Sequence, residues 1–166
     1  MELEQSITYR GTVYPWHCDH MGHMNVMWYV GKFDEASWNL GASLGLTPAY
    51  FRDANRGVVI LEQRLAYKKE LLAGDTVFVQ SKVLEVGEKV ILFAHEMVNA
   101  QTLEVAATSH YTGVHIDRWT RKACPFPPHV HAALRPANGS LRPESKRDES
   151  IASDCGEPGI LARHSA

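Results

Sequence analysis

The sequence predicts an α+β domain in which one long helix lies against an antiparallel sheet. Apolar residues recur every three or four positions over residues 26–44, which is the spacing of one helical face. Four later runs, between residues 57 and 117, alternate apolar and polar residues as half-buried strands do. Short turn-like segments separate these runs, and short connections favour antiparallel pairing of consecutive strands.

The first strand and the long helix are predicted from local patterns. Residues 6–16 alternate polar and apolar side chains, so we expect a first strand there. Asn25 is a candidate N-cap for the helix because its short side chain can accept from a free helix-start N–H. Gly41 and Gly45 are the candidates for its end, since glycine readily adopts the conformation that closes a helix.

Thr47 and Pro48 predict a second, short helix over residues 47–53, with threonine as its cap and proline in its first turn. After it we expect a four-stranded meander, each strand lying beside the next. The predicted strands are residues 57–71, 75–86, 89–99 and 104–117.

The composition changes after residue 120, where six of the eight prolines lie. Residues 125–134 predict one or two more helical turns. Residues 136–166 are rich in Ser, Gly, Pro and mixed charges, and this composition predicts a poorly ordered extension. We therefore divide the chain into a folded domain, residues 1–135, and a C-terminal extension, residues 136–166.

The overall composition argues against several classes of protein. With 166 residues, 45% of them hydrophobic and a net charge of −2, the chain has a globular composition without the basic excess typical of nucleic-acid binding. It lacks a run of about 20 apolar residues that would span a bilayer, and its first residues do not read as a secretory signal. Three scattered cysteines do not make a disulfide framework. We expect a cytoplasmic protein without nucleic-acid or membrane partners.

Asp19 is the leading candidate for a catalytic residue. It lies just before the predicted helix start, where backbone N–H groups are unpaired and partly positive. Such amides can polarise a thioester carbonyl while an ionised carboxylate attacks it or activates water, and no metal is needed. The alternative is that Asp19 is an ordinary capping or turn acid.

A metal site is the second hypothesis for this segment, because it holds five side chains of metal-ligand type. Alternate residues of a strand point to opposite faces, so the five cannot all converge. No second cluster with ligand-like spacing occurs in the sequence, and we predict no metal site and no cofactor. The five residues are His17, Cys18, Asp19, His20 and His23.

Three further residues have both a structural and a functional interpretation. Tyr29 lies on the apolar face of the helix, where it is either a core aromatic or a pocket wall whose hydroxyl reaches the acyl group. Lys68 and Lys69 precede a predicted turn, where they are either solvated or a seat for the phosphates of a coenzyme.

Two motifs resemble those of a known family. Residues 18–29, Cys-Asp-His-Met-Gly-His-Met-Asn-Val-Met-Trp-Tyr, followed by Phe-Asp-Glu-Ala at 33–36, resemble the signature loop and helix of the 4-hydroxybenzoyl-CoA thioesterase-like group of hotdog-fold proteins. Residues 67–77 resemble the segment that enters that group's third strand, and the resemblance covers about residues 6–118. The Gly-His-Met-Asn version is also similar to betainyl-CoA thioesterases and to thioesterase domains of carnitine dehydrogenases.

The resemblance implies a hotdog fold, a long central helix wrapped by a five- or six-stranded antiparallel sheet, that forms dimers or tetramers with active sites at the dimer interface. It places the catalytic carboxylate at Asp19, the carbonyl-polarising amide at Val26 or a neighbour, and the helical tyrosine at Tyr29. We assign five residues as candidates for binding the substrate: His23, Asn25, Tyr29, Lys68 and Lys69.

The function predicted from these residues is hydrolysis of a small or medium acyl-CoA thioester. A second hypothesis is a non-hydrolytic module that binds acyl-CoA or acyl carrier protein, since a fold alone does not decide activity. A third is a hydrolase or dehydratase for another activated acyl compound; in a dehydratase, His20 or His23 would have to carry the catalytic role.

Overall fold

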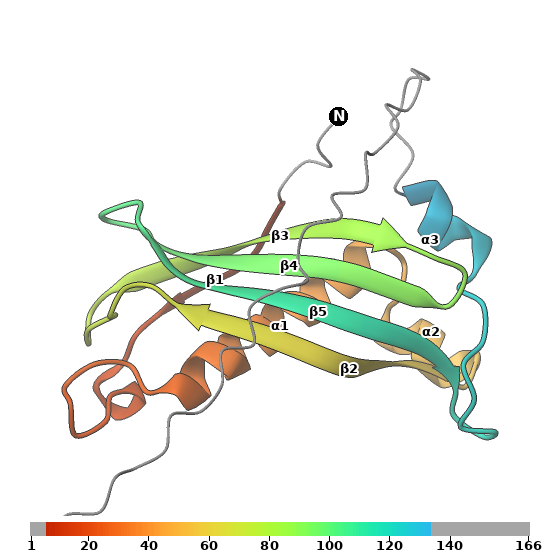
Figure 1. Cartoon of the computed structure of the whole chain (residues 1–166), viewed down its shortest axis with the longest axis horizontal. Helices are drawn as coiled ribbons and strands as arrows, with labels where there is room; N and C mark the ends of the chain where they lie inside the picture. The colour runs from red at the N-terminus through yellow and green to blue at the C-terminus, as the bar shows by residue number, and fades with distance from the viewer. Residues whose placement is uncertain (1–5, 134–166) are drawn as a thin grey trace, which may run out of the picture. The chain divides into compact units, whose positions relative to one another are not determined.

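The structure is a computed structural model, and it describes residues 6–133 (Figure 1). The predicted extension, residues 136–166, lies outside the described residues. Within them the chain forms five strands, three α-helices and one short 3-10 helix at Pro15–His17. The strands are β1 (Ser6–Thr12), β2 (Arg56–Tyr67), β3 (Thr76–Val86), β4 (Val90–Asn99) and β5 (Val105–Asp117). The helices are α1 (Val26–Ser43), α2 (Pro48–Asp53) and α3 (Pro128–Ala133).

The five strands form one antiparallel sheet in the order β1-β3-β4-β5-β2, and α1 lies along one of its faces (Figure 1). The predicted α+β class and its central helix are confirmed. The predicted four-stranded meander is wrong in one respect: only β3, β4 and β5 follow one another across the sheet. β2 pairs with β5 and forms one edge, whereas β1 pairs with β3 and forms the other.

The connection between β2 and β3 explains this difference. Residues 68–75 separate the two strands, and eight residues reach much further than the roughly 14 Å that three strand spacings require. Leu71 in this connection is buried against the core. The connection is therefore an anchored crossing from one side of the sheet to the other, and not the short turn between neighbouring strands that the sequence predicts.

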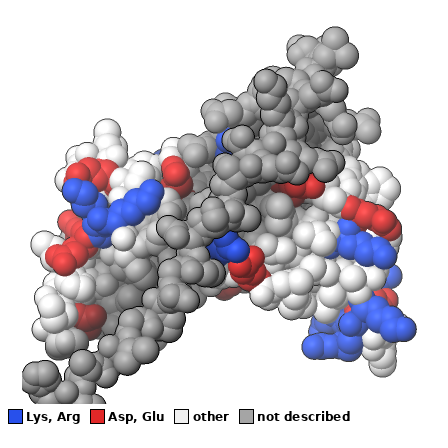
Figure 2. Space-filling model, in the orientation of Figure 1, with Lys and Arg blue, Asp and Glu red and all other residues white. Residues whose placement is uncertain are grey.

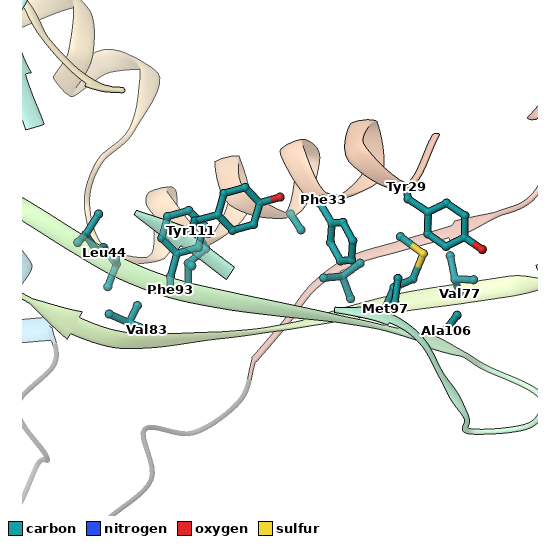
Figure 3. Packing of buried hydrophobic residues seen from close by; sticks show 14 of the residues in the cluster. Tyr29, Phe33, Leu44, Val77, Val83, Phe93, Met97, Ala106 and Tyr111 are labelled. Carbon is teal, nitrogen blue, oxygen red and sulfur yellow. The ribbon is translucent and has the colours of Figure 1, made fainter. Parts of the chain in front are cut away.

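The core lies between α1 and the inner face of the sheet. Figure 3 shows the rings of Tyr29, Phe33 and Tyr111 in a row between the helix and the strands. The alternation predicted for β3 and β4 is confirmed, since every second residue is buried from Val77 to Val83 and from Ile91 to Met97. The buried residues of that pattern include Val77, Val79, Val83, Ile91, Phe93 and Met97.

The predicted helix boundaries are confirmed, while the first strand is shorter than predicted. The side chain of Asn25 accepts from the Met27 N–H and caps α1, and Gly45, at φ +82°, follows its C-terminus. Thr47 caps α2 in the same way. β1 ends at Thr12 instead of residue 16, because the chain turns into the 3-10 helix that precedes the Asp19 loop.

A buried hydrogen-bond chain joins the sheet to α1. The Ser37 hydroxyl donates to the Phe33 carbonyl, so its oxygen accepts from His95 Nε2 at 2.8 Å. His95 Nδ1 is then unprotonated and accepts from the Ser81 hydroxyl at 2.6 Å. Burial lowers the pKa of His95 to about 4, so the ring is neutral over the physiological range.

Candidate active site

The loop before α1 is held in a closed form by its own backbone. Cys18 and Met24 form an antiparallel bridge, and the Asp19 N–H donates to the His23 carbonyl at 3.1 Å. The Gly22 N–H donates back to the Asp19 carbonyl at 3.0 Å. Gly22 has a φ of +83°, which a residue with a side chain rarely adopts. The glycine therefore allows the sharp turn that returns the chain to the start of α1.

Bonds at both ends of this loop anchor it to the domain. The Met24 N–H donates to the Leu71 carbonyl at 2.7 Å, and the Asn25 N–H donates to the His17 carbonyl at 2.9 Å. His17 is buried, and its Nδ1 accepts from the Tyr14 N–H. Burial first, and then the charge of Lys32, hold the pKa of His17 below its usual value. His17 is thus a neutral support beneath the loop.

Asp19 lies in this loop with both carboxylate oxygens bonded. Oδ1 accepts from the Met21 N–H at 2.9 Å, and Oδ2 accepts from the Asn25 Nδ2–H at 3.1 Å. These two bonds, the backbone bond first, lower the pKa of Asp19 below its usual value. The carboxylate is therefore ionised at neutral pH and fixed in orientation, with lone pairs left on both oxygens.

The start of α1 leaves the Val26 amide available next to the loop. Asn25 occupies the next two donors: Oδ1 accepts from the Met27 N–H at 3.0 Å, and its carbonyl accepts from the Trp28 N–H at 3.0 Å. Within residues 6–133 the Val26 N–H has no hydrogen-bond acceptor. Asn25 therefore connects the two groups: its side chain donates to the ionised Asp19 carboxylate, and the next residue, Val26, carries the unpaired N–H.

The other predicted site residues lie around the connection 68–75. Tyr29 is 3% exposed and its hydroxyl donates to the Lys69 carbonyl at 3.3 Å. Burial raises the pKa of Tyr29 to about 12, with Tyr67 adding to the effect. Lys69 Nζ is 3.0 Å from a Glu104 carboxylate oxygen and Lys68 is exposed. His23 Nε2 is 3.7 Å from a Glu70 carboxylate oxygen. The structure thus brings Asp19, Asn25 and Val26 together, while the tyrosine hydroxyl and the lysines belong to the neighbouring segment.

Figure 2 shows Lys and Arg intermixed with Asp and Glu on the visible face of the molecule. Among the described residues, no three His, Cys, Asp or Glu side chains come together as a metal site would require.

Sequence reasoning missed a cavity of about 340 Å³ beside the second half of α1. Its walls come from α1, α2 and the sheet and are mostly apolar. Four of its α1 residues follow the helical spacing i, i+3, i+4, i+7: Asp34, Ser37, Trp38 and Gly41. That stripe, in which an acid, a serine and a glycine stand beside an exposed tryptophan, was the signal that could have revealed it. Arg56 and Arg118 also line the cavity, near the start of β2 and the end of β5.

The fold and this loop define a class: a hotdog-fold domain with an acid at the start of its central helix. The family model described as the thioesterase-like superfamily matches residues 13–134, and the chain belongs to this superfamily. The predicted thioesterase resemblance and the predicted thioester hydrolase are confirmed at this level. No curated protein matches the sequence closely enough to count as a relative.

Several solved structures are similar to this chain. A gentisyl-coenzyme A thioesterase is 26% identical with a TM-score of 0.65, over 76% of this chain and 97% of that one. A 1,4-dihydroxy-2-naphthoyl-CoA thioesterase from Synechocystis is 18% identical with a TM-score of 0.69, over 77% and 94%. A Staphylococcus aureus protein solved in complex with CoA is 19% identical with a TM-score of 0.73, over 84% and 92%. In the part of this chain with a described structure, no helix is long and apolar enough to cross a membrane.

Proposed function

We propose that the protein hydrolyses a small or medium acyl-CoA thioester to the free acid and CoA. The observation that carries this proposal is the fixed, ionised Asp19 carboxylate beside the unpaired Val26 N–H at the start of α1. Family membership supports the reaction type, and the gentisyl-coenzyme A thioesterase, which acts on a CoA thioester, supports the coenzyme.

In the proposed reaction the thioester carbonyl accepts a hydrogen bond from the Val26 N–H, which stabilises the negative charge that develops on the oxygen. In one route Asp19 attacks the carbonyl carbon, the C–S bond breaks and CoA leaves as a thiolate. Water then hydrolyses the resulting anhydride, which restores the carboxylate. In the other route Asp19 takes a proton from the water that attacks the carbonyl. Both routes yield one free acid and one CoA thiol.

The complete site is proposed to form between two copies of the chain. The cavity lining begins at Asp34, about 12 Å along α1 from Val26. Within a single chain, Asp19 and the cavity are therefore apart. β2 is a long edge strand with exposed apolar side chains, and an unpaired edge of this kind is suited to pairing with another strand. The exposed apolar residues of β2 and α1 include Val59, Ile60, Leu61, Val26, Met27, Val30 and Trp38.

The remaining candidates for binding the substrate keep their proposed role. His23 is a partly exposed residue of the Asp19 loop, where its ring can contact a bound thioester. Lys68 has an exposed ammonium group, and Lys69 would have to exchange Glu104 for a coenzyme phosphate. For Tyr29 a role in binding requires its hydroxyl to leave the Lys69 carbonyl.

The proposal is tested by following thiol release from aromatic, medium-chain, betainyl and carnitine-derived CoA thioesters. We expect Asp19→Asn to fold normally and to lower kcat by about a thousandfold or more, because the amide is neither a nucleophile nor a base. Asp53→Asn is the matched control, since Asp53 is an exposed acid on α2. If the wild type binds CoA esters but Asp19→Asn changes nothing and no thiol is released, the chain is a binding module instead.

A further inference from the structure

Asn25 is the residue whose hydrogen bonds connect the two halves of the proposed site. Its four polar groups are all engaged within the chain: the N–H with the His17 carbonyl, the carbonyl with the Trp28 N–H, Oδ1 with the Met27 N–H and Nδ2 with Asp19. The second hydrogen on Nδ2 and one lone pair on each of the two oxygens are left for any other partner. Asn25 therefore has only this part of its hydrogen-bonding capacity left for binding a substrate, the role predicted for it from the sequence.

The orientation of the Asn25 amide is fixed by its partners. The Met27 N–H can only donate, so the atom that faces it is the amide oxygen. The Asp19 carboxylate can only accept, so the atom that faces it is the amide nitrogen. Turning the amide over would place the Nδ2 donor against the Met27 N–H and the Oδ1 acceptor against the Asp19 carboxylate, and neither pair can form a hydrogen bond. Asn25 is therefore held in one orientation by groups of opposite kind.

We infer that Asn25 is a positioning residue that sets Asp19 and the Val26 N–H in a fixed relation to each other. By occupying the Met27 N–H it leaves the Val26 N–H as a free donor, and by donating to Asp19 it aims the carboxylate. The assignment of Asp19 as the catalytic acid rests on the proposed function. The hydrogen bonds of Asn25 do not depend on it.

Two substitutions separate this role from simple helix capping. Asn25→Ser keeps an oxygen that can cap α1, since serine and asparagine are comparable N-caps. Its shorter side chain lacks the amide N–H that donates to Asp19. Asn25→Asp also keeps the cap and places a second carboxylate beside Asp19, which opposes ionisation of the pair. Asn39→Ser is the matched control, because Asn39 is on α1 and its side chain donates to the Thr8 carbonyl.

The first measurement is the pKa of the Asp19 carboxyl, followed by carbon-13 NMR in the full chain. We expect it to rise in Asn25→Ser and to rise further in Asn25→Asp, by more than about one pH unit, with no change in Asn39→Ser. The melting temperature of Asn25→Ser should stay within about 3 °C of the wild type. An Asp19 pKa that is unchanged in both Asn25 variants would overturn the inference.

The second measurement is the pH dependence of thioester hydrolysis. We expect kcat for Asn25→Ser to fall about 10- to 100-fold with its acidic limb moved upward, because a misplaced acid slows the chemical step. A rise in KM alone, with the pH profile unchanged, would show Asn25 to be a substrate contact and would overturn the inference. If Asp19→Asn is fully active while the Asp19 pKa still responds to Asn25, the positioning stands and the proposed catalytic assignment fails.

Discussion

At its N-terminal end α1 begins beside a polar loop that presents a carboxylate and a free amide; along its second half it borders an apolar cavity. The first region offers reacting groups and the second offers space. None of the residues from 19 to 29 lines the cavity. The difference teaches that, within residues 6–133, the polar groups and the apolar space lie at different points along one helix. The proposed two-copy site would bring the two together.

The strongest test of the proposed two-copy site uses two variants of the chain, one altered in the Asp19 loop and the other in the cavity. Asp19→Asn removes the acid, and Gly41→Phe fills the cavity; a Cβ at Gly41 meets no atom closer than 3.6 Å. If the acid of one copy serves the cavity of the other, mixing the two inactive variants restores one site in each mixed dimer. Random mixing then gives about a quarter of wild-type activity.

The control for the mixing experiment is a chain that carries both substitutions. Mixed with Asp19→Asn it restores nothing, since no acid is present. If acid and cavity instead belong to the same chain, the first mixture stays inactive. That result would remove the two-copy site from the proposed function while leaving the role of Asp19 intact.

The second prediction uses pH to distinguish the regions. His95, which bonds Ser37 at the cavity, has a pKa of about 4 against an unfolded value near 6.5. Below pH 6.5 the unfolded chain binds a proton that the folded chain does not, so stability falls as the pH falls towards 4. This group alone contributes about 3 kcal/mol to that loss. Asp19→Asn should change the pH profile of activity and leave the contribution of His95 to the pH dependence of stability unchanged.

Urea unfolding at a series of pH values measures this effect. In His95→Gln we expect the slope between pH 6.5 and 4 to be smaller than in the wild type. The variant should also be less stable at pH 7 by about 2 kcal/mol, because buried partners at Ser37 and Ser81 lose their bonds. An unchanged slope would mean that His95 is not the group that titrates.

The smallest expected effect concerns Tyr29, which lies in the first turns of α1. Tyr29→Phe removes the hydrogen bond to the Lys69 carbonyl and should cost about 1 kcal/mol of unfolding free energy. If the hydroxyl bonds only the Lys69 carbonyl and does not contact the substrate, kcat/KM stays within about twofold of the wild type. A tenfold or larger fall in kcat/KM would instead support the predicted contact with the substrate.

The two regions also differ in how far the sequence predicted them. The loop and the helix start are local: Asn25 lies six residues from Asp19, and a cap followed by an apolar period predicts both the helix boundary and the free amides. The long, strongly periodic helix and the alternating strands were predicted for the same reason.

The cavity and the strand order depend on residues that are distant in sequence. Periodicity shows which face of β2 is apolar but does not show which strand lies beside it, and the short connection suggested the wrong neighbour. The bond from Tyr29 to Lys69 spans 40 residues, and the pair of Lys69 and Glu104 spans 35. No local pattern encodes such contacts, so the partners of these residues had to come from the structure.

The crossing connection also affects where the protein can be altered. Exposed loops are the usual places for affinity tags, fluorescent labels or inserted peptides. Residues 68–75 are a poor choice, because the carbonyls of Lys69 and Leu71 accept from Tyr29 and from Met24. An insertion there would displace the carbonyl of Leu71, to which the Asp19 loop is bonded through the Met24 N–H. The β4–β5 turn at residues 100–103 is better suited, since its bonds run only to its own turn and to Thr76 at the start of β3.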